Sequence, residues 1–168
     1  MKLLNRISNS IVIIEKYLVV SILSFMIILA FFQVILRNVF GTGILWIDPL
    51  LRQFVLWLCF LGASIATQKK KHININILGH FFSKRYKLAS NLLINLFGAI
   101  ITFTLAYASY KFVIDEISAR TIIFTIGNVE ILSWWSQVII VVGFSLMTFR
   151  FMIEIIISLK ELLVSQRV

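Results

Sequence analysis

Four uninterrupted apolar stretches dominate the chain. They contain no Asp, Glu, Lys, Arg or His, and they cover residues 17–36, 53–68, 88–110 and 131–149. A helix that crosses a membrane needs about 20 apolar residues, and three of the stretches approach or exceed that length. The second is shorter, but Arg52 at its start can extend its charged head to the lipid headgroups. The pattern predicts an all-α integral membrane protein with four transmembrane helices, at about residues 17–36, 50–68, 88–110 and 131–149.

The composition excludes a soluble protein. The chain has 168 residues, of which 60% are hydrophobic and 14% charged, whereas soluble domains have about 45–50% apolar and about 25% charged residues. A disordered chain is excluded as well, because disorder requires low hydrophobicity and high charge. We expect residues 1–168 to form a single four-helix membrane domain. Cys59 is the only cysteine, so no disulfide can form within the chain.

The positions of the basic residues predict the orientation in the membrane. Three Lys or Arg residues precede the first apolar stretch, six lie in the second connection and three follow the fourth stretch. The first and third connections hold only two each. Basic residues near transmembrane ends collect on the cytoplasmic side. The terminal segments and the second connection together hold twelve basic residues, and the first and third connections hold four. This distribution predicts that both termini are cytoplasmic.

Amphipathic segments are expected on the inner side of the membrane. Apolar residues recur at helical spacing before the first stretch and after the fourth, and they also fill the second connection between its two basic clusters. Such segments can lie flat in the membrane interface, and we expect a short flat helix in the second connection. The candidate inner-interface anchors are Lys69, Lys70, Lys71 and His72.

No pattern in the sequence indicates an active site. A haem-binding anchor needs histidines inside its helices, but His72 and His80 both lie in the second connection. All seven acidic residues lie outside the four apolar stretches, whereas ion and substrate pathways are marked by ionisable groups within the membrane. Inverted repeats typical of secondary transporters are not visible either. The sequence therefore predicts no catalytic residue, no metal site and no cofactor, and it argues against an enzyme or a self-sufficient transporter.

Small and mildly polar residues form stripes on two of the predicted helices. Helices in lipid pack through such residues, because they allow close approach of the backbones and hydrogen bonds across the interface. The stripes could serve packing within this chain or form a seam for another membrane protein, and their spacing does not separate the two. The candidate seam residues are Gly62, Ala63, Asn91, Asn95, Gly98 and Thr102.

A group of polar residues flanks the first connection. It comprises Arg37, Trp46, Asp48 and Arg52. Asp48 and Arg52 are four residues apart and could pair on one helix, although an exposed pair adds only about 0.3–0.5 kcal/mol. Trp46 could be an interfacial anchor. The alternative is that the group orients the loop for a partner protein.

These same residues carry a resemblance to a known family. The sequence has Arg37-Asn38-Val39-Phe40, then Trp46-Ile47-Asp48 with Arg52, then Phe60-Leu61-Gly62-Ala63-Ser64, and finally Lys69-Lys70-Lys71-His72-Ile73-Asn74-Ile75-Asn76. In this order and spacing the chain resembles the DctQ-type small membrane subunit of tripartite ATP-independent periplasmic (TRAP) transporters. The specific motif covers about residues 37–78. Pro49 and Asn76 depart from it, since family members often have acidic residues there.

The resemblance implies a function that the residues alone do not supply. The chain would be a non-catalytic small permease subunit in the bacterial inner membrane, in a sodium-coupled system that takes up organic acids such as C4-dicarboxylates or sialic acid. Its implied partners are a large elevator-type permease subunit, which carries the sodium and substrate sites, and a periplasmic substrate-binding receptor. Arg37, Trp46, Asp48 and Arg52 would then contact the receptor or the large subunit. The alternatives are the small subunit of a tripartite tricarboxylate transporter and the membrane anchor of a redox complex.

Overall fold

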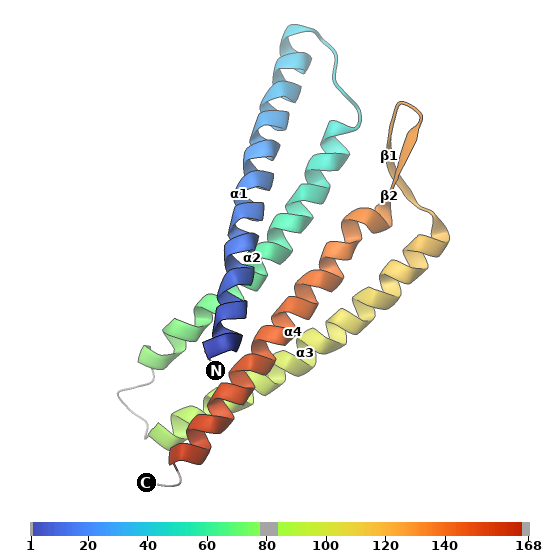
Figure 1. Ribbon diagram of the computed structural model, residues 1–168. Coiled ribbons are helices and arrows are strands. Elements are labelled where there is room, and N and C mark those ends of the chain that lie inside the picture. Colours follow the sequence, from blue (N-terminus) through green and yellow to red (C-terminus); the bar gives the residue numbers. More distant parts are fainter. Residues whose placement is uncertain (1, 78–83, 166–168) are drawn as a thin grey trace.

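The computed structural model describes residues 2–77 and 84–165, which form four long helices and one β-hairpin (Figure 1). Each helix contains a segment long and apolar enough to cross a membrane, which confirms the predicted class of helical membrane protein. The four segments are Ser10–Val39, Ile47–Gln68, Ala89–Ala119 and Ser133–Lys160. In chain order the elements are α1 (Lys2–Val39), α2 (Ile47–Ile77), α3 (Lys84–Ala119), β1 (Ile122–Ile126), β2 (Val129–Leu132) and α4 (Ser133–Ser165).

The helices are longer than the uncharged stretches. A Lys, Arg or Glu ends an apolar stretch, but these residues are good helix formers and do not end a helix. In the second connection, α2 continues to Ile77 and α3 begins at Lys84, so residues 72–77 of the segment expected as a separate flat helix belong to α2. The remainder of that segment, residues 78–83, lies outside the described residues. It includes Leu78, His80, Phe81 and Phe82.

The helices pack side by side in the order α1, α2, α4, α3. An edge-to-face contact between Phe25 and Phe54 joins α1 to α2, with ring centroids 5.8 Å apart. A similar contact between Phe60 and Phe144, at 5.2 Å, joins α2 to α4. The most extensive contact is between α3 and α4. The chain therefore forms an open row with α1 and α3 at its edges.

The row has two distinct ends (Figure 1). The start of α1 and the end of α4 lie together at one end, which we call the terminal end. The loop between α1 and α2 and the β-hairpin lie at the other, which we call the hairpin end. This arrangement follows from four helices that alternate in direction.

The β-hairpin is an element that the apolar pattern did not predict. β1 and β2 pair antiparallel with Ile126 opposite Val129, so that Gly127 and Asn128 form a two-residue turn. Gly127 has φ +59°, and a glycine with positive φ at the first turn position is typical of type II′ hairpins. The buried Ser133 begins α4 directly after the hairpin, and its side chain donates a hydrogen bond to Glu116 of α3. The hairpin is thus attached firmly to the ends of α3 and α4.

Candidate functional site

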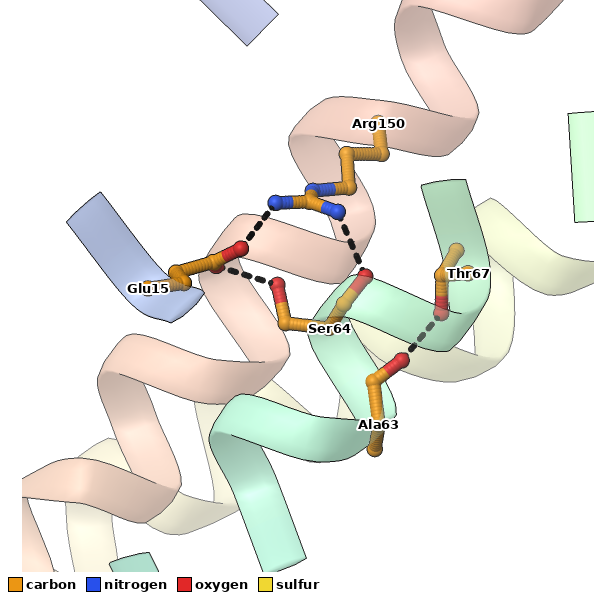
Figure 2. A network of polar contacts seen from close by, with 5 residues as sticks. All are labelled: Glu15, Ala63, Ser64, Thr67 and Arg150. Atoms are coloured by element: carbon orange, nitrogen blue, oxygen red, sulfur yellow. Dashed lines mark hydrogen bonds and ion pairs between the residues drawn. The ribbon is translucent and has the colours of Figure 1, made fainter. Parts of the chain in front are cut away.

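A buried polar network joins three helices (Figure 2). Arg150 of α4 donates one hydrogen bond from Nη2 to Oε2 of Glu15 in α1 and another from Nη1 to the carbonyl oxygen of Ser64 in α2, each at 2.5 Å. The Ser64 hydroxyl donates to Oε1 of Glu15 at 2.7 Å. Glu15 is 3% exposed, Ser64 0% and Arg150 5%. Both carboxylate oxygens and both terminal guanidinium nitrogens therefore have partners.

The network places two formal charges inside the apolar spans. Glu15 belongs to the span Ser10–Val39 and Arg150 to the span Ser133–Lys160. Arg150 directly follows the uncharged stretch 131–149, and Glu15 precedes the stretch 17–36 with only Lys16 between them, so both charges lay outside the predicted membrane segments. Charged residues within membrane spans usually pair with each other or with backbone carbonyls, and Arg150 does both. A Glu and an Arg at the terminal ends of two apolar stretches are the only sequence signal of this pair.

The polar stripe of α3 lies against α4. The Thr148 hydroxyl donates to the Thr102 hydroxyl at 2.9 Å, and Thr102 in turn donates to the carbonyl of Gly98 at 2.8 Å. A Cβ atom on Gly98 would lie 2.7 Å from the ring of Phe151, so the glycine allows the two helices to approach closely. Asn91 and Asn95 are half-buried on α3.

The small residues of α2 are arranged differently. Gly62 and Ala63 are exposed, and a Cβ atom on Gly62 would meet nothing within 4 Å. The contact with α4 is formed instead at Gly143, where a Cβ atom would lie 2.7 Å from Cδ1 and 2.9 Å from Cβ of Phe60. The candidate seam thus has an α3 part that packs within the chain and an α2 part that the chain leaves uncovered.

Polar contacts fix the loop between α1 and α2, residues 40–46. The Gln33 side chain makes two hydrogen bonds to the backbone of Ile44, one to its carbonyl at 3.1 Å and one from its amide at 3.2 Å. Gly41, with φ +64°, allows the chain to turn after α1. Ile47, 1% exposed, anchors the start of α2.

The four candidate contact residues lie at this hairpin end, but the ion pair differs from the one considered above. Asp48 lies 3.8 Å from the guanidinium of Arg37, across the loop, rather than pairing with Arg52. The Arg37 and Asp48 side chains are 69% and 47% exposed. Arg52 is exposed and Trp46 half-buried. The structure therefore brings Arg37 and Asp48 together and leaves Arg52 exposed.

The candidate inner-interface anchors lie within the last turns of α2, at Lys69, Lys70, Lys71 and His72. In the part of the chain that the structure describes, no three His, Cys, Asp or Glu residues gather where they could hold a metal ion. The polar groups described above hold helices and a loop in place.

Large apolar side chains are exposed along both edge helices. Exposed apolar area of this extent is buried by lipid or by other membrane proteins. On α1 the exposed side chains include Val20, Ile27, Ile28, Phe31 and Val34, and on α3 they include Leu93, Phe97, Ile101, Phe103 and Phe112.

Four apolar helical spans, two of them joined by a buried ion pair, define a multi-pass integral membrane protein. Residues 26–161 match the family model of the DctQ component of tripartite ATP-independent periplasmic transporters. The chain belongs to this family, the small permease subunits of TRAP transporters, as the motif around residues 37–78 had indicated.

Two relatives agree with this assignment. A TRAP transporter small permease protein of Haemophilus influenzae is 39% identical over 63 residues, which cover 38% of this chain and 39% of that protein. The sialic acid TRAP transporter small permease protein SiaQ of Vibrio cholerae is 25% identical over 168 residues, which cover 97% of this chain and 89% of that protein.

Proposed function

We propose that this chain is the scaffold subunit of a sodium-coupled TRAP transporter for organic acids, of the C4-dicarboxylate or sialic acid class. It binds the stationary part of a large permease subunit that carries the sodium and substrate sites, and it helps to dock the periplasmic receptor. The subunit lies in the bacterial inner membrane with both termini in the cytoplasm, where its Lys and Arg residues contact the anionic leaflet.

The main observation in support of the scaffold role is that the buried charges are paired with each other. Of the described residues, Glu15 and Arg150 are the buried charged ones, and they satisfy each other and Ser64. A transport pathway needs ionisable groups that are available to a solute or an ion, and these two groups are already paired. A subunit of this kind contributes shape and surface, while another subunit moves the solute.

The partner surface for the large subunit is apolar. The exposed side chains on α1 and α3, with the uncovered Gly62 and Ala63 on α2, are suited to helix packing in lipid. The receptor acts on the periplasmic side, which is the hairpin end in this orientation. There the fixed loop, the Arg37–Asp48 pair and Arg52 present polar groups to a soluble protein.

The scaffold role is tested by co-purification and reconstitution. We expect the chain to purify in detergent with a co-expressed large permease subunit, and liposomes to take up solute only when both membrane subunits and the receptor are present. Liposomes with this chain alone are the control and should show no uptake. Uptake by the chain alone, or its purification free of the co-expressed large subunit, would contradict the proposal.

A further inference from the structure

The helix α1 occupies one edge of the row. It packs mainly on α2. Towards the hairpin end it is joined to α2 by Phe25 against Phe54 and by Gln33 bound to the loop. Towards the terminal end, Glu15 of α1 forms an ion pair with Arg150 of α4. Ser64 of α2 binds both partners: its hydroxyl donates to Glu15, and its carbonyl accepts from Arg150.

The network requires all three helices at once. Glu15 and Arg150 are 135 residues apart in the chain, and neither charge is stable alone in an apolar span. The Ser64 hydroxyl holds one carboxylate oxygen, and its carbonyl receives the second guanidinium nitrogen. The full set of contacts therefore forms only when α1, α2 and α4 are all in place.

A second polar contact lies beside the network within α2. The Thr67 hydroxyl donates to the carbonyl of Ala63 at 2.8 Å, next to the Ser64 carbonyl that accepts from Arg150 (Figure 2). Side chains that bond to helix carbonyls in this way often bend helices. The green terminal part of α2 is indeed bent relative to its first part (Figure 1).

We propose that Glu15, Ser64 and Arg150 form an ionic lock that fixes α1 against α4 and holds the four helices in one arrangement. The lock rests on the proposed function in one respect: a scaffold must keep its shape while its partner moves. Without the lock, α1 stays attached to α2 but the terminal ends of α1 and α4 separate. Hydrophobic packing of α3 on α4 does not compensate, because it does not involve α1.

The lock is tested by measuring the distance between α1 and α4 in the purified full chain. Two exposed positions near the terminal end, Ser10 and Leu159, are changed to Cys for spin labels in a Cys59→Ser background. Pulsed electron paramagnetic resonance should give one narrow distance distribution for this chain. The double variant Glu15→Met with Arg150→Met removes both charges and leaves no unpaired one. We expect it to broaden the distribution or shift it to longer distances.

The control is Lys16→Met, which removes an exposed charge next to Glu15 on the same helix and should leave the distribution narrow. An unchanged narrow distribution in the double Met variant would overturn the lock, because packing alone would then suffice to hold α1.

A second test compares the thermal stability of single-charge variants with that of a charge swap, and it does not need the double Met variant to fold. Glu15→Gln and Arg150→Gln each leave one buried charge unpaired and should lower the midpoint of thermal unfolding in detergent by on the order of 10 °C. The swap Glu15→Arg with Arg150→Glu restores the pair and should recover part of that loss. A swap no more stable than the single variants would contradict the lock. These readouts use the small subunit alone, so they separate failure of the lock from failure of the scaffold role, which co-purification decides.

Discussion

At the scale of single residues, the glycines show which helix surfaces are in contact. Gly143 faces Phe60, and the nearest atoms include the Cβ of that side chain, which cannot move without the backbone of α2. Gly98 faces the far end of the Phe151 ring, which can rotate away. Gly62 faces open space within this chain. Three glycines in apolar helices, alike in sequence, therefore have three different structural roles.

We expect Gly143→Ala to destabilise the protein by about 1–3 kcal/mol, as overpacking of a close contact does. Gly98→Ala should cost less, because the Phe151 ring can give way. Gly62→Ala is the matched control for an isolated chain and should be neutral or slightly stabilising, since Ala is the better helix former. Thermal unfolding of the purified subunit in detergent measures all three. A Gly143→Ala variant as stable as Gly62→Ala would show that α2 and α4 are not packed at this point.

The sequence indicates which residues share a helix face, but not which neighbour covers that face. The helical spacing of Asn91, Asn95, Gly98 and Thr102 places them on one face of α3, and the structure brings Gly98 and Thr102 against α4. Spacing along a helix cannot show which neighbour covers the face. The Glu15–Arg150 pair could not be predicted from local pattern, because its two members come from opposite ends of the chain and each lies just beyond an uncharged stretch.

At the scale of elements, a few local residues determine the structures of the two connections at the hairpin end. The four helices follow from apolar length alone, whereas the β-hairpin depends on a short signal: a Gly-Asn turn between two runs of β-branched and apolar residues. Such short runs do not stand out beside stretches of 20 apolar residues. The loop between α1 and α2 depends on Gln33, whose side chain replaces backbone partners for Ile44.

This loop offers an element-scale test of receptor docking. We expect Arg52→Glu to reduce receptor-dependent uptake several-fold while assembly with the large subunit is retained, because an exposed charge contributes little to folding. Asp48→Lys should also reduce uptake, since it places two positive charges near each other at Arg37. Uptake by reconstituted complexes, measured over a range of receptor concentrations, provides the readout.

Asp115→Lys is the control for the loop variants, as it reverses an exposed charge on α3 away from the loop. The Arg37→Asp and Asp48→Arg double variant restores an ion pair and should recover more uptake than Asp48→Lys alone. If the Arg52 and Asp48 variants take up solute like the unmodified complex, these residues have no part in docking.

At the scale of the whole molecule, an open row of helices gives a broad apolar surface from a short chain. A closed bundle would bury the same side chains against each other, whereas here α1 and α3 remain largely uncovered at the edges. Such a row needs more than hydrophobic contact to keep its shape, because lipid tails are as apolar as the helices. The ionic network at Glu15 and the polar contacts of the loop tie α1 to the row near its two ends.

The orientation of this row is the remaining whole-molecule prediction, and the basic residues determine it. Arg150 is paired inside a span, yet eleven other Lys and Arg residues belong by sequence to the N-terminal segment, the second connection and the C-terminal segment, against four in the first and third connections. In a Cys59→Ser background, Leu45→Cys, at a position 92% exposed in the loop, should react with a membrane-impermeant maleimide in intact spheroplasts. Lys160→Cys, exposed near the terminal end, should react only after the membrane is permeabilised. The reverse labelling pattern would place the loop in the cytoplasm, where a periplasmic receptor could not reach it.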